Sequence, residues 1–124
     1  MNSDVNTSVK QVKDLGESAC EALLQEVVKN GLPVGCIDPS MERAHFEVSR
    51  DPYDSSYSLI GVWRDERGNK QGEILFHSDG SFFAEYDVIS EHPTRPQWFV
   101  EAVTAWGNRN LLKTELRLLP AVGT

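Results

Sequence analysis

The sequence predicts an α+β protein in which one N-terminal amphipathic helix packs on a curved, meandering antiparallel sheet of five or six strands. Three observations support this fold class. Only one segment, near the N-terminus, has helical periodicity, and the chain after it alternates with a period of two. Most connections between the alternating segments are too short for the crossovers that parallel strands need.

The composition is typical of one soluble globular domain. The chain has 124 residues, of which 40% are hydrophobic and 25% are charged. A chain of this size can bury a hydrophobic core that is stable without disulfide bonds or a structural metal. The net charge of −7 argues against a nucleic-acid or anionic-membrane partner, because phosphate groups would repel it. The segment "MNSDVNTSVK" lacks the apolar part of a signal peptide, and no apolar run is long enough to cross a bilayer. We therefore expect a cytoplasmic protein.

The helix is expected over residues 9–29. Residues 1–7 are expected to form a flexible tail, followed by a single domain over residues 8–124. Ser8 and Gln11 have the spacing of a capping box, which predicts the start of the helix. Asn30-Gly31 followed by Pro33 is typical of a helix end.

The rest of the chain is expected to form the sheet. The turn in "HSDGSF" is interpreted as a three-residue loop, because that register pairs Phe76 with Phe82 and Ile74 with Ala84. A two-residue loop would instead place Ile74 beside Glu85. The same reasoning on the last hairpin pairs Trp106 with Leu112, Thr104 with Thr114, Ala102 with Leu116, Val100 with Leu118 and Glu101 with Arg117.

Together the two hairpins predict which face of the sheet meets the helix. The predicted core residues are Leu59, Trp63, Ile74, Phe76, Phe82, Tyr86, Val100, Trp106, Leu112 and Leu116.

The opposite face is predicted to be apolar at its centre, although a free antiparallel face is usually polar. Its apolar residues are Ile60, Val62, Leu75, Phe83, Phe99 and Val103, and its charged rim includes Arg64, Glu73, Glu85 and Arg117. We expect this face to be covered by a second subunit, another protein, the loop of residues 31–40 or a ligand, or to be partly hidden by curling of the sheet.

Two groups of residues are candidates for chemistry. Glu73 and Glu85 face each other in the expected register, and paired carboxylates can divide acid and base roles. The alternative is a solvated pair neutralised by cations, with Arg64 opposite Glu73 if "RGNK" turns tightly. Glu26, Tyr86 and Trp63 are the candidate residues of a pocket between helix and sheet, where Glu26 or Tyr86 would act as acid or base. The alternative for Glu26 is a boundary residue whose carboxylate reaches water.

Motifs for a metal, a cofactor or an activated nucleophile are not found in the sequence. His45, His77 and His92 lack metal-ligand spacing, and Cys20 and Cys36 fit neither CxxC nor a zinc site. We therefore expect no metal and no cofactor, and favour a non-catalytic protein with buried thiols in a reducing compartment.

Three resemblances can be described. "GVWR" resembles the Gly-x-Trp signature of lipocalins at Gly61 and Trp63, but the chain is too short for their eight-stranded barrel. A helix before an antiparallel meander is similar to cystatins, whose inhibitory glutamine-x-valine-x-glycine loop is absent. "GEILFHSDGSFFAEYDV" and "RPQWFVEAVTAWG" resemble small bacterial proteins of no assigned function, which implies no activity.

The sequence thus predicts a small binding or protein-interaction module that forms a homodimer, or binds a protein partner, through the second sheet face. The alternative is an enzyme or small-ligand-binding protein that uses the pocket between helix and sheet.

Overall fold

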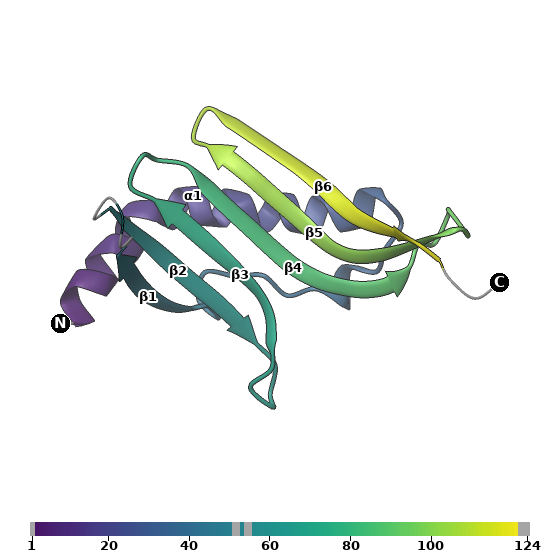
Figure 1. Cartoon of the computed structure of the whole chain (residues 1–124), viewed down its shortest axis with the longest axis horizontal. Helices are drawn as coiled ribbons and strands as arrows, with labels where there is room; N and C mark the ends of the chain where they lie inside the picture. Colours follow the sequence, from purple (N-terminus) through teal and green to yellow (C-terminus); the bar gives the residue numbers. More distant parts are fainter. Residues whose placement is uncertain (1, 51–52, 54–55, 122–124) are drawn as a thin grey trace.

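The computed structural model describes residues 2–50, 53 and 56–121, and it consists of one long helix and one sheet (Figure 1). The sheet has six antiparallel strands that follow one another in chain order, each paired with the next. The elements are α1 (Asn2–Lys29), the short 3₁₀ helix η1 (Val34–Cys36), β1 (His45–Arg50), β2 (Tyr57–Arg64), β3 (Lys70–His77), β4 (Phe82–Glu91), β5 (Trp98–Asn108) and β6 (Leu111–Pro120). The predicted fold class is confirmed.

The helix starts earlier than the sequence predicted. α1 begins at Asn2, so residues 2–7 extend it, and the expected tail is wrong for these residues. The physical reason is that the apolar stripe continues upstream, since Val5, Val9 and Val12 all pack against the core. Ser8 therefore lies inside the helix rather than at a capping box.

The end of the helix agrees with the prediction. Gly31 adopts a φ of 84°, a left-handed conformation that glycine tolerates without a steric penalty. The amides of Gly31 and Leu32 donate to the carbonyls of Val28 and Val27 at 3.0 and 2.9 Å. These bonds satisfy carbonyls that the helix leaves open at its C-terminus.

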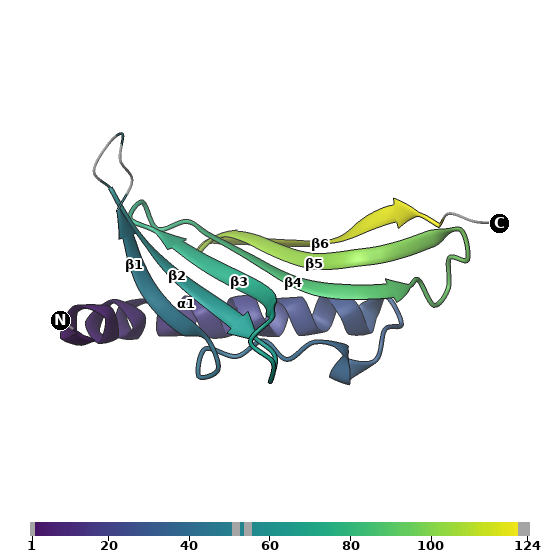
Figure 2. The same ribbon diagram turned by 60° about the horizontal axis from the view of Figure 1, so that its bottom comes forward.

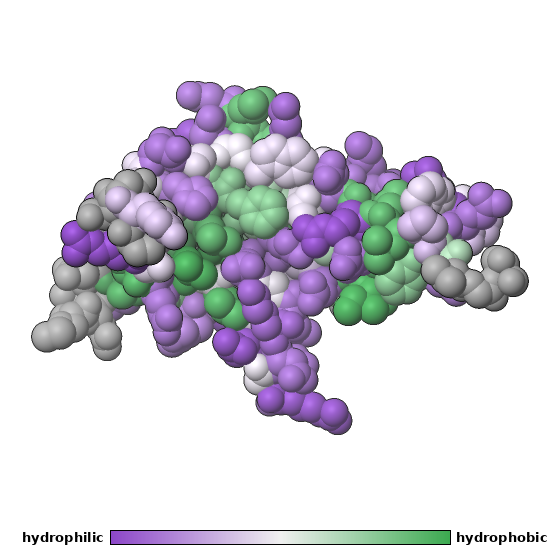
Figure 3. All heavy atoms as spheres, viewed as in Figure 1, coloured by the Kyte–Doolittle hydropathy of each residue, from purple (hydrophilic) through white to green (hydrophobic). Residues whose placement is uncertain are grey.

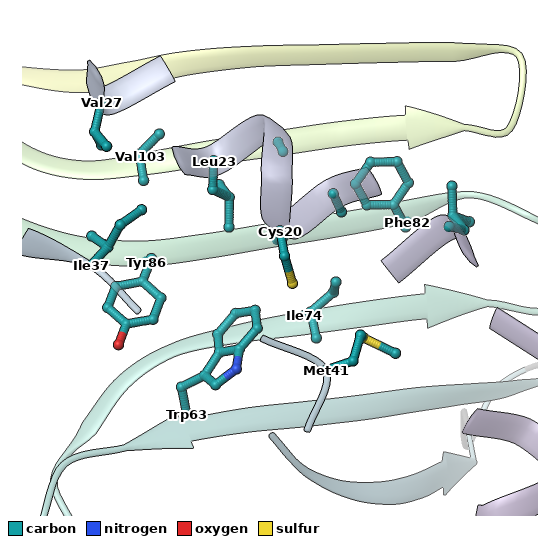
Figure 4. Packing of buried hydrophobic residues seen from close by; sticks show 14 of the residues in the cluster. Cys20, Leu23, Val27, Ile37, Met41, Trp63, Ile74, Phe82, Tyr86 and Val103 are labelled. Atoms are coloured by element: carbon teal, nitrogen blue, oxygen red, sulfur yellow. The ribbon is translucent and has the colours of Figure 1, made fainter. Parts of the chain in front are cut away.

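The molecule has two layers, with α1 against one face of the curved sheet (Figure 2). Period-two alternation places every second side chain of β2 and β3 in this core, and α1 packs mainly on β5 and β6. Figure 4 shows Val27 of the helix beside Val103 of the sheet, and Leu23 and Cys20 pointing toward Trp63 and Ile74. The fully or nearly fully buried members include Ala19, Leu23, Val27, Trp63, Ile74, Phe82, Tyr86, Val100, Val103 and Ala105.

The segment that follows the helix also lies on the helix side of the sheet. Leu32, Ile37 and Met41 are buried in the same core cluster. The indole N–H of Trp63 donates to the carbonyl of Ser40 at 2.8 Å, which ties the segment to β2. The expectation that the loop of residues 31–40 could cover the second face is therefore wrong.

The β3–β4 hairpin has the predicted register. Phe76 pairs with Phe82, Ile74 with Ala84, and Glu73 with Glu85. The amide of His77 donates to the carbonyl of Ser81 at 2.9 Å, and Gly80 has a φ of 92° within the three-residue loop. The hydrophobic pattern was a reliable guide here because a slip by one residue would have buried Glu85.

The β5–β6 hairpin does not have the predicted register over most of its length. Val100 pairs with Leu118 as expected, but Ala102 pairs with Arg117, Thr104 with Glu115 and Trp106 with Lys113. A two-residue turn replaces the longer loop, because the Asn108 side chain accepts from the amides of Asn110 and Leu111 at 2.8 and 3.0 Å. An irregularity between Val100 and Ala102 absorbs the one-residue shift.

This shift changes the predicted core. Val103 is completely buried on the helix side, whereas Trp106 is only half-buried and lies on the opposite face with its strand neighbour Phe83. Leu116 is partly buried, and Leu112 is 37% exposed. The other seven predicted core residues, Leu59, Trp63, Ile74, Phe76, Phe82, Tyr86 and Val100, are all buried.

Among the described residues, no helix is both long and apolar enough to span a membrane.

Candidate functional site: the open sheet face

The sheet face that points away from α1, here called the open face, carries a row of apolar side chains. Strand register aligns Ile60 of β2, Leu75 of β3, Phe83 of β4 and Trp106 of β5, and we call these four residues the apolar row. Each is half-buried, since neighbouring side chains cover part of it. Figure 3 shows the apolar area on this face, which no described element covers.

A charged belt crosses the same face next to the apolar row. It consists of Lys70, Glu73, Glu85, Asp87 and Arg117. Arg117 donates to both oxygens of Glu85 at 2.9 and 3.0 Å, a bidentate pair that raises the pKa of the guanidinium. Lys70 donates to Glu73 at 3.0 Å. The two facing carboxylates are thus each held by their own cation, which fits the solvated alternative better than a shared acid–base pair.

Asp87 has no such partner among the contacts of the belt. Its pKa is raised, first by partial burial and then by the neighbouring charges of Glu85 and Glu101. The belt therefore keeps a surplus of negative charge around Asp87.

Arg64 lies next to Lys70 at the end of the belt, and its predicted position opposite Glu73 is wrong. Val62 pairs with Glu73, while Arg64 pairs with Lys70 across an irregularity in the ladder. The turn is wider than a two-residue loop, because the amide of Asp65 donates to the carbonyl of Asn69 at 2.9 Å. Arg64 donates to the carbonyl of Gly68 at 2.9 Å.

The three other apolar residues predicted for this face lie in three different parts of the structure. Val62 is half-buried beside the belt. Phe99 pairs with Glu91 and Leu119 and lies at the far end of β5, where Figure 3 shows a second apolar area beyond the charged belt. Val103 belongs to the helix-side core, so its assignment to this face is wrong.

The structure brings together two of the three residues predicted for a pocket between helix and sheet. The rings of Trp63 and Tyr86 lie 5.5 Å apart, centroid to centroid. Glu26 lies elsewhere, where its carboxylate accepts from Thr114 of β6 at 2.7 Å and from Asn30 at 2.8 Å. These bonds connect the helix to the edge strand, which agrees with the boundary interpretation of Glu26.

Tyr86 lines a hollow of about 620 Å³ that sequence reasoning missed. The other side chains of this hollow include Ile37, Arg43, Arg64, Arg67 and Gln71. They come from the segment after α1, from the end of β2, from the β2–β3 turn and from the start of β3. Only the path of the folded chain joins them, so no local motif in the sequence could have revealed the site.

The cysteines and the exposed Ser–His pair offer little for catalysis. Burial raises the pKa of the Cys20 thiol to about 12, with a smaller contribution from Glu17, and burial also raises the pKa of Cys36. Both thiols are free. Ser58 and His77 share a cross-strand hydrogen bond of 3.1 Å, but Oδ1 of the nearby Asp79 accepts from the amide and the hydroxyl of Ser81 at 2.9 and 2.6 Å. Within residues 2–50, 53 and 56–121, no three His, Cys, Asp or Glu side chains form a metal-binding group.

Comparison of the chain with protein-family models, curated proteins and solved structures finds no match.

Proposed function

We propose that this protein is a small interaction module that self-associates as a homodimer through the open face of its sheet. The apolar row carries this proposal. Four large apolar side chains align across four strands on the face that α1 does not cover. An antiparallel sheet with one solvated face usually carries polar residues there, and a solvent-facing apolar patch is typical of an interaction surface.

The charges at the two ends of the apolar row favour a second copy of the chain as the occupant. Glu47 of β1 adjoins Ile60 at one end, and Lys113 of β6 adjoins Trp106 at the other. We place a twofold axis parallel to the strands, between Leu75 and Phe83. The apolar row then packs against the same row of the second copy in reverse order, so that Leu75 faces Phe83 and Ile60 faces Trp106 of that copy. Each Glu47 then meets Lys113 of the second copy, so opposite charges fix the register of the interface.

The charged belt is compatible with such an interface. Glu85 is already paired with Arg117 and Glu73 with Lys70, so covering the belt leaves these four charges with partners. Asp87 opposes association because its charge is the least compensated. Apolar burial contributes roughly 25 cal/mol per Å², and it can exceed this opposition if the interface approaches the ordinary size of about 800 Å² per partner.

The first test is sedimentation velocity of the wild type and of Phe83→Lys over a range of protein and salt concentrations. We expect a dimer for the wild type and a monomer for Phe83→Lys, because the new charge would be buried in the apolar row. Dimerisation should strengthen with salt, which screens the repulsion between two chains of charge −7. Val28→Lys is the matched control, since Val28 is 49% exposed on α1 and lies away from this face.

A charge exchange tests the orientation. Lys113→Glu should weaken the dimer, and the double variant Glu47→Lys with Lys113→Glu should restore it. A wild type that stays monomeric at millimolar concentration would overturn the proposed function. Dimerisation that Phe83→Lys leaves unchanged would equally exclude the open face as the interface.

We also propose that the module works in the reducing cytoplasm, as its two free thiols support.

A further inference from the structure

We propose that the hollow beside Tyr86 binds a small anion, namely the phosphate or carboxylate group of a polar metabolite. The hollow lies on the helix side of the sheet, between the segment that follows α1 and the β2–β3 turn. Figure 4 places Tyr86 between Ile37 and Trp63 in the core cluster. Arg64 also borders the open face beside Ile60 and Val62, but the hollow contains no residue of the apolar row, and the proposal does not depend on dimerisation.

The first observation is the concentration of arginine in an acidic protein. Three of the seven arginines of the chain, Arg43, Arg64 and Arg67, line this one hollow. Arg64 and Arg67 lie close together at the end of β2 and in the β2–β3 turn, and the fold brings Arg43 to them from the segment after α1. Guanidinium groups match the planar, two-oxygen geometry of carboxylates and phosphates, and like charges repel unless an anion lies between them.

Arg43 is held rigidly at the base of the hollow. Its guanidinium donates to the carbonyls of Asp38 and Arg64, to the Tyr86 hydroxyl at 3.3 Å and to Oε1 of Gln71 at 3.3 Å. All four acceptors are neutral oxygens, so these four bonds themselves leave the charge of the guanidinium intact. The Tyr86 hydroxyl raises the pKa of the guanidinium further, so Arg43 stays cationic.

The nearby carboxylates are largely occupied. Asp38 lies 3.4 Å from Arg43 and pairs with it. Asp65 turns into its own loop, where it accepts from the amides of Arg67 and Asn69 at 2.9 Å each. Backbone donation from Asn69 is the main reason that the pKa of Asp65 is lowered. Asp38, Asp65 and Glu66 thus equal the three arginines in number, and the case for an anion rests on the hydrogen-bond donors that are left without an acceptor.

Two donors of the hollow have no acceptor within the described part of the chain. The Gln71 carbonyl oxygen accepts from Tyr86 at 3.0 Å and from Arg43, which fixes the side chain, while its amide nitrogen donates to none of the described groups. The Arg67 guanidinium likewise has no hydrogen-bond or ion-pair partner there. An anion in the hollow would give both donors a partner.

The volume and lining restrict the ligand class. About 620 Å³ is the size of a pocket for a small molecule. Most of the lining side chains are charged or hydrogen-bonding, with Ile37 and the ring of Tyr86 as apolar exceptions. A polar anion of metabolite size fits this lining better than a lipid or another apolar ligand.

The test is titration of the labelled protein with inorganic phosphate and, separately, with citrate, followed by NMR. The readouts are the side-chain amide of Gln71 and the indole N–H of Trp63, whose ring contacts Tyr86. We expect saturable shifts of both signals with at least one probe. Tighter binding of phosphate would assign the phosphate class, and tighter binding of citrate would assign the carboxylate class.

Two variants and a control complete the experiment. Arg67→Ala removes a guanidinium that the fold does not use, and Gln71→Glu keeps the acceptor for Tyr86 and Arg43 but replaces the free donor by an acidic oxygen. Each should weaken binding roughly tenfold, as expected for one charge-assisted hydrogen bond. Arg95→Ala makes the same charge change in the β4–β5 connection and should leave binding unchanged.

Absence of a saturable shift with both probes would overturn the proposal. Equal weakening by Arg95→Ala and Arg67→Ala would also overturn it, because it would mean that the anions only screen the overall charge.

Discussion

At the scale of single residues, two aspartates show how the same side chain can oppose or support the fold. Asp87 lies in the charged belt near Glu85 and Glu101, and its pKa is raised by partial burial and by these charges. Asp65 accepts three hydrogen bonds within its turn, and its pKa is lowered by the donation from Asn69 and other groups. Neutral substitutions at the two positions should therefore act in opposite directions.

We predict that Asp87→Asn stabilises the protein at pH 7. The native state holds the Asp87 proton to a higher pH than the unfolded chain does. The free energy of unfolding therefore falls as the pH rises from the ordinary aspartate pKa of about 3.9 through the raised native value. Removing this charge should raise the free energy of unfolding by less than about 1 kcal/mol, because solvent screens a group that is mostly exposed. Urea denaturation at pH 7 and pH 3 measures the difference, which should vanish at the lower pH.

Asp65→Asn is the matched comparison. Its lowered pKa means that the ionised carboxylate contributes stability above the ordinary pKa, and that this contribution is lost as the pH falls through the native value. The variant should thus be less stable than the wild type at pH 7. Stabilisation by Asp65→Asn, or destabilisation by Asp87→Asn, would contradict this electrostatic account.

At the scale of elements, β4 contains a strained position. Ile89 has a φ of 51°, and it is the one non-glycine residue with positive φ within residues 2–50, 53 and 56–121. It lies where the pairing of β4 with β5 shifts between Asp87 and Ser90. A β-branched residue in the left-handed region is strained, and the penalty is roughly 1–2 kcal/mol. The irregularity between Asp87 and Ser90 is a β-bulge that changes the direction of the end of β4, and the backbone strain at Ile89 is its energetic cost.

We predict that Ile89→Asn increases the free energy of unfolding by up to about 1 kcal/mol. Asparagine tolerates the left-handed conformation, and the loss of apolar contacts is small because Ile89 is 68% exposed. Urea denaturation at pH 7 provides the measurement. Val48→Asn on β1, at a 41% exposed position without positive φ, should show no such gain. A clear loss of stability in Ile89→Asn would show that the bulge is not strained by its side chain.

The two hairpins show how much of the sheet the sequence could predict. The β3–β4 register was predicted correctly because Asp79-Gly80 marks the turn and an error by one residue would bury Glu85. "GNRN" contains no comparable signal. The Asn108 side chain selects the shorter turn, and the irregularity near Glu101 hides the shift, since Val100 still pairs with Leu118. The exchange of Val103 and Trp106 between the two faces followed from that single error.

The candidate sites differ in how far the sequence could reveal them. Ile60, Leu75 and Phe83 were predictable because alternation within strands determines which face each residue occupies. The hollow was not predictable, because Arg43 meets Arg64 and Tyr86 only through the path of the segment after α1. The prediction that Glu26 lines a pocket rested on its position at the edge of the apolar face of the helix. Its contact with Thr114 could not be predicted, because the position of Thr114 depends on the corrected β5–β6 register.

At the scale of the whole molecule, the helix stabilises one face of the sheet and leaves the other without a cover. α1 and the segment after it bury the core residues on the same side. The apolar row on the open face is only half-buried in the single chain. If a second copy covers this row, assembly and folding are thermodynamically linked, because the partner binds the native state and not the unfolded chain.

We predict that the thermal midpoint of the wild type rises with protein concentration and that the midpoint of Phe83→Lys does not. The dependence follows from mass action, since a higher concentration populates the dimer and withdraws native monomer from the unfolding equilibrium. Differential scanning calorimetry over a roughly hundredfold range of concentration measures it, since such a range corresponds to a mass-action term of about 2.7 kcal/mol per dimer. Leu23→Ala separates this effect from general destabilisation, because Leu23 is completely buried in the helix-side core. This variant should lose about 2–5 kcal/mol but keep the slope of midpoint against concentration. A wild-type midpoint that is independent of concentration would show that the open face stays uncovered and that the single chain is the stable unit.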